Sequence, residues 1–290
     1  MTALPSVLVG IATRNRAREL DKAIRSAQAQ TCKPLRIAVT DDASKDPTWD
    51  LRAVFPDVTW QRFDAHRGLV AARNAMMLAA HEDYYVSLDD DAWLVDGDEI
   101  ATAIAFLEER RDVAALAFDI LSPDRPERVP RQAAKAVAMF IGCGHVLRLA
   151  AVKAIGGYAD FPGLYGSEEK DLGLRLIETG YDIVRMPGLH VWHDKSEQAR
   201  DLVAQHRSGV CNDLVMIWWR TPSALLVPFL MWKLMRHLIF ALRLKLMKSC
   251  LAGFGDFAVT VAKGDVRRAP LKLSTFSRYS ALLAARPDAA

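Results

Sequence analysis

The stretch YYVSLDDDAW, residues 84–93, places three consecutive aspartates directly after a run of strand-forming residues. Side chains alternate along an extended segment, so Asp89 and Asp91 would point in one direction and Asp90 in the other. Two carboxylates on one side could bind a hard divalent cation, Mg²⁺ or Mn²⁺, that carries a diphosphate. The alternative is a solvated acidic turn that caps the next helix, because a D-x-D pattern is too short to be specific alone.

On both sides of this stretch the chain alternates strand and helix patterns. Apolar runs predict strands at 7–12, 35–40, 58–63 and 84–88, and helical spacing of apolar residues predicts helices at 17–30 and 69–80. Such alternation predicts an α/β fold with a mostly parallel, doubly wound, Rossmann-like sheet that binds ligands at the carboxyl ends of its strands. Asp41 and Asp42 close the second strand as the aspartate triplet closes the fourth. Two acidic clusters are therefore expected at one edge of the sheet.

Composition sets limits on the function. The chain has 290 residues, of which 51% are hydrophobic and 25% are charged, enough for one large core and an appendage. A net charge of +3 is too small to suggest a nucleic-acid partner. The four cysteines lie far apart without a C-x-x-C pair, so we expect neither a zinc site nor a disulfide framework, and a reducing cytoplasm fits. Residues 1–10 are expected to form a buried strand and not a signal peptide.

Several segments together resemble a known family, the inverting glycosyltransferase family 2 of GT-A-fold nucleotide-sugar glycosyltransferases, over roughly residues 5–215. The segments are VLVGIATRNR at 7–16, VTDDASKD at 39–46, HRGLVAARN at 66–74 and the aspartate triplet. The resemblance implies that the turn formed by Ala12, Thr13 and Arg14 wraps the nucleoside of the sugar donor. It also implies that Asp42 contacts the nucleobase and that Arg73 approaches the sugar donor. For Arg73 the alternative is an ordinary surface arginine.

The same resemblance assigns a cation site. It implies that Asp91 holds Mn²⁺ or Mg²⁺, that Asp90 reaches the ribose, and that Asp89 supports the metal or the sugar donor. In PGLHVWHDKS, residues 187–196, His193 matches the position at which several relatives carry a histidine that completes the metal shell. His190 would lie on the opposite face of an extended segment, so the two histidines are not expected to be co-ligands. The alternative for a lone histidine is a packed or surface residue.

The catalytic base is expected in GLYGSEEKDLGLRL, residues 163–176, which resembles an acidic pair at the start of a helix followed by D-L-x-x-R. A carboxylate near the acceptor hydroxyl can remove its proton. The match places the base at Glu169, where the family usually has aspartate, and Glu168 remains a rival. Ser167 followed by carboxylates would also cap a helix whether or not the helix is catalytic.

The segment GCGH, residues 142–145, resembles the part of the family fold that lines the acceptor and sugar pocket. Small residues there would let a substrate approach the backbone. We interpret Cys143 as a packing residue and not a nucleophile, because no base is evident near it in the sequence.

The last part of the chain, residues 216–290, is predicted to be a helical appendage to a catalytic domain at 1–215. Residues 221–248 mix leucine, tryptophan and phenylalanine with five basic residues, so we expect this segment to be too charged to cross a bilayer. It is predicted to lie on an anionic membrane surface. The alternative is an amphipathic helix packed on the catalytic domain or on a second subunit. The basic residues are Lys233, Arg236, Arg243, Lys245 and Lys248.

The sequence thus predicts a metal-dependent inverting glycosyltransferase. It would transfer a sugar from a nucleoside-diphosphate-sugar, a UDP- or dTDP-sugar being expected, to a hydroxyl acceptor that is lipid-linked or part of an envelope glycan. The expected location is cytoplasmic and peripheral on the inner face of the cell membrane. One alternative is a nucleotidyltransferase, which would need a glycine-rich phosphate loop that residues 12–16 lack. The other is an inactive sugar-nucleotide-binding or membrane scaffold protein, against which the acidic residues at each expected position argue.

Overall fold

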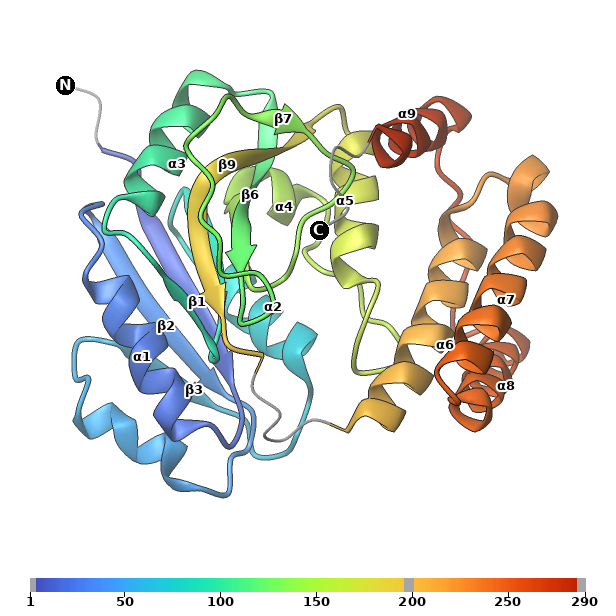
Figure 1. Cartoon of the computed structure of the whole chain (residues 1–290), viewed down its shortest axis with the longest axis horizontal. Helices are drawn as coiled ribbons and strands as arrows, with labels where there is room; N and C mark the ends of the chain where they lie inside the picture. The colour runs from blue at the N-terminus through green and yellow to red at the C-terminus, as the bar shows by residue number, and fades with distance from the viewer. Residues whose placement is uncertain (1–3, 196–200, 286–290) are drawn as a thin grey trace.

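A computed structural model describes residues 4–195 and 201–285 of the chain and confirms the predicted α/β class (Figure 1). A nine-stranded sheet has the strand order β3-β2-β1-β4-β8-β6-β9-β5, and β7 pairs with β9 off this path. The strands are β1 (Val7–Thr13), β2 (Leu35–Asp41), β3 (Thr59–Arg62), β4 (Tyr84–Asp89), β5 (Ala92–Leu94), β6 (Val113–Leu121), β7 (Lys135–Ala136), β8 (Gly144–Arg148) and β9 (Asp182–His193). The helices are α1 (Ala17–Gln28), η1 (Pro47–Ala53), α2 (Leu69–Ala79), α3 (Glu99–Glu109), α4 (Leu149–Ala154), α5 (Glu168–Glu178), α6 (Leu202–Arg220), η2 (Ser223–Leu225), α7 (Leu226–Arg243), α8 (Met247–Lys263) and α9 (Leu273–Ala284).

The amino-terminal half of the sheet is parallel, as expected from its alternating strands and helices. β1 pairs in parallel with both β2 and β4, and β2 pairs in parallel with β3. The register places Thr13 opposite Asp41 and Ala12 opposite Asp89. The carboxyl ends of β1, β2 and β4 therefore meet at one edge, where both acidic clusters lie. The other half is mixed, because β8 runs antiparallel to β4 and β6, and β5 runs antiparallel to β9.

Both faces of the sheet are covered by helices with apolar faces. On one face Leu20 and Ile24 of α1 and Ile100 and Leu107 of α3 pack against the strands in one core cluster. On the other face a second core cluster includes residues of α2, α4, α5 and α6. The sheet is therefore buried on both sides, and its carboxyl edge is left for binding.

The carboxyl-terminal helices α6, α7 and α8 form a group beyond α5, which lies between them and the sheet (Figure 1). α6 is continuous from Leu202 to Arg220 and so runs through residue 215, the boundary expected between the two regions. The segment Ser223–Arg243 is long and apolar enough to cross a membrane by length and composition, with a mean hydropathy of 1.6 over its best window. The expectation that it stays at the interface remains a prediction.

Helix α7 turns two of its polar residues, Lys233 and His237, toward α6, whereas Arg236 and Arg243 are exposed. Lys233 Nζ lies 2.7 Å and His237 Nε2 lies 3.0 Å from Asp213 Oδ2 of α6. Asp213 is buried, and Lys170 Nζ of α5 lies 3.3 Å from its other oxygen. Lys233 therefore is not part of the basic surface, contrary to the sequence prediction, because Asp213 holds it inside the helical group. The outer face of α7 is apolar instead, with exposed Val227, Met231, Trp232, Met235, Ile239, Phe240 and Leu242.

Candidate active site

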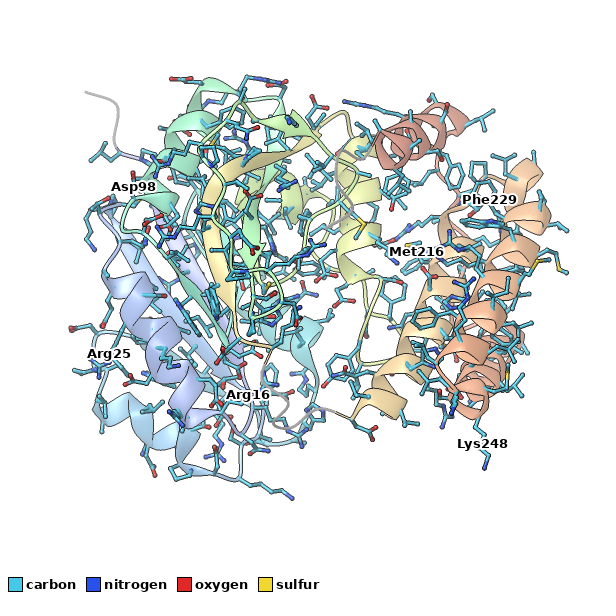
Figure 2. The ribbon with its side chains drawn as sticks, viewed as in Figure 1. Arg16, Arg25, Asp98, Met216, Phe229 and Lys248 are labelled. Carbon is cyan, nitrogen blue, oxygen red and sulfur yellow. The ribbon has the colours of Figure 1, made fainter. Side chains whose placement is uncertain are left out.

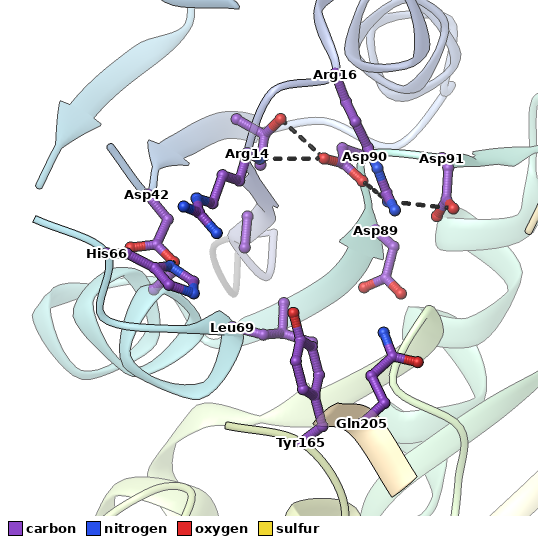
Figure 3. Close-up of a pocket in the computed structure, with 13 residues that line it drawn as sticks. Arg14, Arg16, Asp42, His66, Leu69, Asp89, Asp90, Asp91, Tyr165 and Gln205 are labelled. Atoms are coloured by element: carbon purple, nitrogen blue, oxygen red, sulfur yellow. Dashed lines mark hydrogen bonds and ion pairs between the residues drawn. The ribbon is translucent and has the colours of Figure 1, made fainter. Parts of the chain in front are cut away.

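A cavity of about 290 Å³ lies at the carboxyl edge of β1, β2 and β4 (Figure 3). It brings together almost all of the residues predicted to bind the sugar donor, although they come from segments up to about 80 positions apart. The predicted residues that line it are Ala12, Thr13, Arg14, Asp42, Asp89, Asp90 and Asp91. The predicted convergence of two acidic clusters is therefore confirmed, and the contacts that these residues make with a ligand stay predictions.

Arg16 forms ion pairs with two carboxylates of the aspartate triplet. Arg16 Nη1 lies 2.8 Å from Asp90 Oδ1 and 3.2 Å from Asp91 Oδ2. The second oxygen of Asp90 accepts hydrogen bonds from Thr13 Oγ1 at 2.9 Å and from the Arg14 N–H at 3.3 Å. Burial raises the pKa of Asp90 to about 6, although the neighbouring Arg16 charge lowers it. Asp90 thus fixes the turn after β1 in addition to its predicted role at the ribose.

Asp42 holds the turn before α2. Its Oδ2 lies 2.6 Å from His66 Nδ1 and accepts the N–H of Gly68 at 2.8 Å, and its Oδ1 accepts the N–H of Arg67 at 2.7 Å. Gly68 has φ +91°, a conformation that side chains with a Cβ rarely adopt, so glycine is needed at this turn. The carboxylate fixes one wall of the cavity, and its contact with a nucleobase stays a prediction.

Arg73 is fully enclosed in the protein, so the alternative of an ordinary surface arginine is wrong. Its side chain is 2% exposed, and it donates to Asp89 Oδ1 at 2.7 Å and to Glu169 Oε1 at 3.1 Å. Gly142 leaves room for this pair: a Cβ there would lie 2.3 Å from Glu169 Oε1 and 2.6 Å from Arg73 Nη2. Arg73 therefore contacts both Asp89 of the aspartate triplet and the predicted base Glu169, although it does not line the cavity itself.

The acidic pair begins α5 without the expected serine cap. Ser167 has φ 76°, and its hydroxyl has no hydrogen-bond partner among the described residues. The helix begins where the pattern predicted, with Ser167 at the N-cap position and Glu168 and Glu169 in the first turn. The serine side chain does not cap the helix, and the backbone at Ser167 is held in a left-handed conformation just before the acidic pair. Glu168 is buried, whereas the side chain of Glu169 is 17% exposed. Burial and the adjacent Glu168 charge raise the pKa of Glu169 to about 7, and Arg73 opposes that rise.

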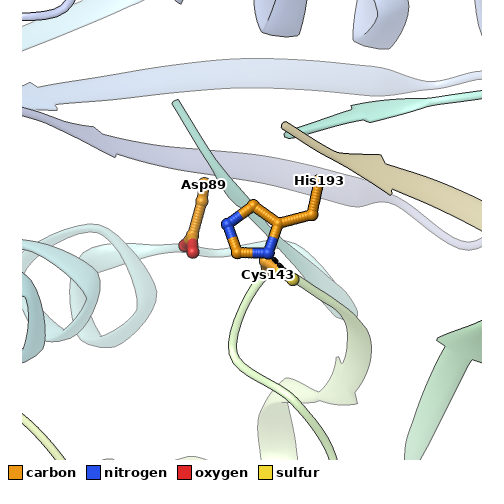
Figure 4. Close-up of side chains that lie close together, drawn as sticks. All are labelled: Asp89, Cys143 and His193. Carbon is orange, nitrogen blue, oxygen red and sulfur yellow. Dashed lines mark hydrogen bonds between the residues drawn. The ribbon is translucent and has the colours of Figure 1, made fainter. Parts of the chain in front are cut away.

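A second group of metal-binding side chains lies beside the triplet (Figure 4). One ligand atom from each of Asp89, Cys143 and His193 lies within 4.8 Å of the others. His193 Nε2 lies 3.2 Å from Asp91 Oδ1. The carboxylate of Asp89 and the imidazole of His193 fit the predicted Mn²⁺, whereas the thiol of Cys143 is typical of softer metals. Cys143 is buried, which agrees with the role of a packing residue, and its Sγ lies 3.6 Å from His193 Nδ1.

The two histidines are separated, as predicted. His190 is 3% exposed and accepts the Val129 N–H on Nε2 at 3.2 Å, away from the His193 contacts. Antiparallel pairing of β5 with β9 sets Ala92 opposite His193, which brings His193 beside Asp91.

Other residues line the cavity without having been predicted. Arg16 lies inside the first matched segment and His66 inside the third, so position in a motif could have indicated both. Tyr165 lies inside the segment 163–176 that was matched for the base, so position in a motif could have indicated it too. Gln205 comes from α6, outside the matched segments, and sequence pattern offered no signal for it.

The sheet order, the helices on both faces and the acidic carboxyl edge define a GT-A-type glycosyltransferase fold. A family model described as glycosyl transferase family 2 matches residues 8–157, and one described as glycosyl transferase family group 2 matches residues 127–262. The first match covers more than half of the chain. The chain therefore belongs to glycosyl transferase family 2, as the sequence motifs predicted.

Relatives agree with this membership. The chain is similar to a pre-mycofactocin glycosyltransferase of Mycobacterium tuberculosis, with 28% identity over 217 residues, which cover 69% of this chain and 45% of that protein. The chain thus spans about half the length of this curated relative. Its fold is similar to that of the mannosyltransferase PcManGT from Pyrobaculum calidifontis in complex with GDP-Man and Mn²⁺, with a TM-score of 0.59, 17% identity and coverage of 98% and 81% of the two chains. It is also similar to S. aureus TarS 1–349 in complex with UDP-GlcNAc, with a TM-score of 0.65, 16% identity and coverage of 87% and 80%.

Proposed function

We propose that this protein is a metal-dependent inverting glycosyltransferase that moves a sugar from a nucleoside diphosphate to a hydroxyl acceptor. The observation that carries the proposal is the link through Arg73. One buried guanidinium contacts both Asp89, which lines the cavity, and Glu169, the predicted base. A sugar donor in the cavity would therefore have a carboxylate close to its reacting end. Solved structures with a similar fold contain GDP-Man with Mn²⁺ or UDP-GlcNAc, which supports a nucleotide-sugar donor.

The cavity walls would hold the nucleoside diphosphate. Asp90 holds the turn after β1 and Asp42 holds the turn before α2, so hydrogen bonds within the protein position both walls. Arg14 and Arg16 line the cavity and supply positive charge for the phosphates. A divalent cation held by Asp91, Asp89 and His193 would neutralise the diphosphate and stabilise it as a leaving group.

Glu169 would act as the base. Its carboxylate removes the proton of the acceptor hydroxyl as the hydroxyl oxygen bonds to the sugar carbon, and the bond from that carbon to the diphosphate breaks. Attack opposite the leaving group inverts the configuration at the sugar carbon. Arg73 would keep Glu169 in place, since the two side chains are in contact. A side chain larger than that of Gly142 would collide with both of them.

A panel of sugar donors tests the proposed activity. The full chain is incubated with UDP-, dTDP- and GDP-sugars and Mn²⁺, and nucleoside diphosphate release is measured with and without a chelator. We expect release from one class of donor and its loss in the chelator. If the chain instead releases pyrophosphate when it is given a nucleoside triphosphate together with a sugar phosphate, it is a nucleotidyltransferase. No release from any donor would favour an inactive binding protein.

The carboxyl-terminal helices support a membrane-bound acceptor. The outer face of α7 exposes apolar residues, and Arg236, Arg243, Lys245 and Lys248 are exposed on or near it. Lys248 projects away from the end of the helical group (Figure 2). An apolar surface with basic residues at its border matches an anionic bilayer, to which each lysine or arginine contributes about 1 kcal/mol. The proposed location is the inner face of the cell membrane, where a lipid-linked or envelope-glycan acceptor would be reached.

A further inference from the structure

His145 of β8 is a buried histidine whose two ring nitrogens both have partners in the protein. Its Nδ1 lies 2.9 Å from the carbonyl oxygen of Ile141, and its Nε2 lies 2.9 Å from the hydroxyl of Tyr158, which is also buried. A carbonyl oxygen can only accept a hydrogen bond, so Nδ1 must carry the hydrogen. Burial and the charge of Arg73 lower the pKa of His145 to about 3, so the ring is neutral and its Nε2 accepts the hydroxyl hydrogen.

The hydrogen bond to Ile141 holds the turn before β8, which lies against the proposed base. Gly142 follows Ile141 in this turn, and a Cβ on it would lie 2.3 Å from Glu169 Oε1 and 2.6 Å from Arg73 Nη2. The backbone of the turn is therefore packed directly against the contact between these two side chains. If the turn shifted, it would press into that contact or leave a gap beside it. By bonding the Ile141 carbonyl, His145 fixes the turn at the place where the base is held.

The hydrogen bond to Tyr158 connects His145 to the helix that carries Arg73. Asn74, the residue after Arg73 in α2, donates its side-chain amide to the Tyr158 carbonyl at 2.9 Å and accepts the Tyr158 N–H at 3.0 Å. The Arg73 guanidinium carbon lies 6.0 Å from the centroid of the Tyr158 ring, at the outer range of a cation–π contact. Tyr158 is thus bound to α2 by its backbone and to His145 by its hydroxyl, and its ring packs beside the arginine.

We propose that His145 and Tyr158 are positioning residues that hold the guanidinium of Arg73 against the proposed base from two sides, through the turn before β8 and through α2. An apolar side chain in place of His145 would leave the Ile141 carbonyl and the Tyr158 hydroxyl without this partner. Neither His145 nor Tyr158 lines the cavity, so they should affect the transfer step and not the binding of the sugar donor. The inference rests on the proposed function of Glu169 as the base.

Nitrogen NMR of the full chain with ¹⁵N-labelled histidine tests the hydrogen bonds without activity. The chain has seven histidines, and the pair of ring signals that is missing from His145→Asn identifies His145. At about pH 7 we expect the shift of a protonated nitrogen for Nδ1 and that of an unprotonated nitrogen for Nε2. In Tyr158→Phe the Nε2 signal should move, because it loses its hydrogen bond. A ring with the hydrogen on Nε2 would refute the network and with it the proposal.

Steady-state kinetics with the active sugar donor test the positioning role. For Tyr158→Phe, which keeps the ring and removes the hydroxyl, we expect kcat to fall by about 10–100-fold with little change in the KM for the donor. His145→Leu should lose at least as much, and His145→Asn, which can still donate to the Ile141 carbonyl, should recover part of the rate. Tyr84→Phe is the matched control and should keep the wild-type kcat. It removes another buried hydroxyl, bonded to Glu108 and Arg148 at the amino end of β4.

Tyr158→Phe and His145→Asn decide the question if His145→Leu does not fold. A wild-type kcat in Tyr158→Phe, or an equal loss in Tyr84→Phe, would show that the network is core packing alone and would overturn the proposal. Failure of the proposed function is distinct, because Glu169→Gln would then keep wild-type turnover. If only this inference fails, Glu169→Gln is still slow while Tyr158→Phe is fully active.

Discussion

At the scale of single residues, the pKa of Glu169 results from opposing effects of its surroundings. Burial and the charge of Glu168 raise its pKa to about 7, and the contact with Arg73 limits the rise. A base is most effective when its pKa lies near the working pH, because the ionised form is then present and still takes up a proton readily. This environment distinguishes Glu169 from Glu168, which is buried and less accessible to an acceptor.

Replacing Glu169 by glutamine keeps the size of the side chain but removes its ability to accept a proton. We expect kcat to fall by about two to four orders of magnitude, with little change in the KM for the sugar donor. Steady-state kinetics with the active donor measure both constants. Glu168→Gln is the matched variant and should retain much more activity. Wild-type turnover in Glu169→Gln beside an inactive Glu168→Gln would move the base by one residue.

The pH dependence follows from the raised pKa of Glu169. Below about pH 7 the carboxyl is protonated and cannot accept the acceptor proton, so activity is lost as the pH falls through that value. We expect kcat to fall by about tenfold per pH unit below the pKa and to level off above it. A pH–rate profile of the wild-type chain checks this. A rate that stays constant down to pH 5, where the chain is still folded by circular dichroism, would argue against a base with this pKa.

The sequence predicted which residues line the cavity better than it predicted the contacts between side chains around it. Carboxylates after apolar strands must meet at a sheet edge, so the positions of Asp42 and Asp89 followed from pattern and resemblance. The contact of Arg73 with Glu169 joins residues 96 positions apart and depends on the small size of Gly142. The left-handed Ser167 was not predictable, because serine before glutamates is also the pattern of a helix cap.

At the scale of elements, the outer face of α7 is the feature that bears on location. Met231→Glu combined with Ile239→Glu places two charges on this exposed face, where they should disturb no internal packing. We expect binding to anionic vesicles in flotation to be strongly reduced while the melting temperature changes little. Val54→Glu, at an exposed apolar residue after η1, is the control and should bind like the wild type. Equal binding by the double variant would show that α7 does not contact the membrane.

Lys233 should behave as a structural residue and not as a membrane contact. It points inward to Asp213, which is buried and also contacts His237 and Lys170. Lys233→Gln should cost about 1–3 kcal/mol, because a charge-assisted hydrogen bond to a buried carboxylate is lost. Thermal unfolding should show a lower midpoint for Lys233→Gln, and vesicle binding should stay near the wild-type level. For Arg236→Gln we expect the reverse, since that side chain is exposed. A reversed pair of results would mean that α7 is rotated from the orientation described.

Strands and helices were predicted best where the pattern of apolar residues within the segment itself indicates the element. The first four strands and the two α-helices between them, α1 and α2, were predicted nearly at their observed bounds, since each has a distinct apolar pattern, whereas η1 was not predicted. The mixed half of the sheet was not predicted, because the antiparallel insertion of β8 between β4 and β6 depends on pairing between distant segments. The inward side of α7 was missed for the same reason: its polar partner, Asp213, lies on another helix.

At the scale of the whole molecule, the two proposed functional surfaces are joined through α5 and α6. Glu169 lies in the first turn of α5, the next residue, Lys170, contacts Asp213 of α6, and Asp213 contacts Lys233 of α7. Gln205 of α6 lines the cavity as well. A membrane-bound face of α7 would therefore be connected by direct contacts to the helix that carries the proposed base, which suits an acceptor supplied from the bilayer.

The most direct test of the account is the configuration of the sugar after transfer or hydrolysis. With an active donor whose sugar is α-linked to the diphosphate, proton NMR in the first minutes of reaction identifies the anomer formed before mutarotation. A single base at Glu169 and a diphosphate leaving group on the opposite side predict the β-anomer, and Glu169→Gln should form it far more slowly. An α-anomer as the first product would contradict the inverting mechanism and the role assigned to Glu169.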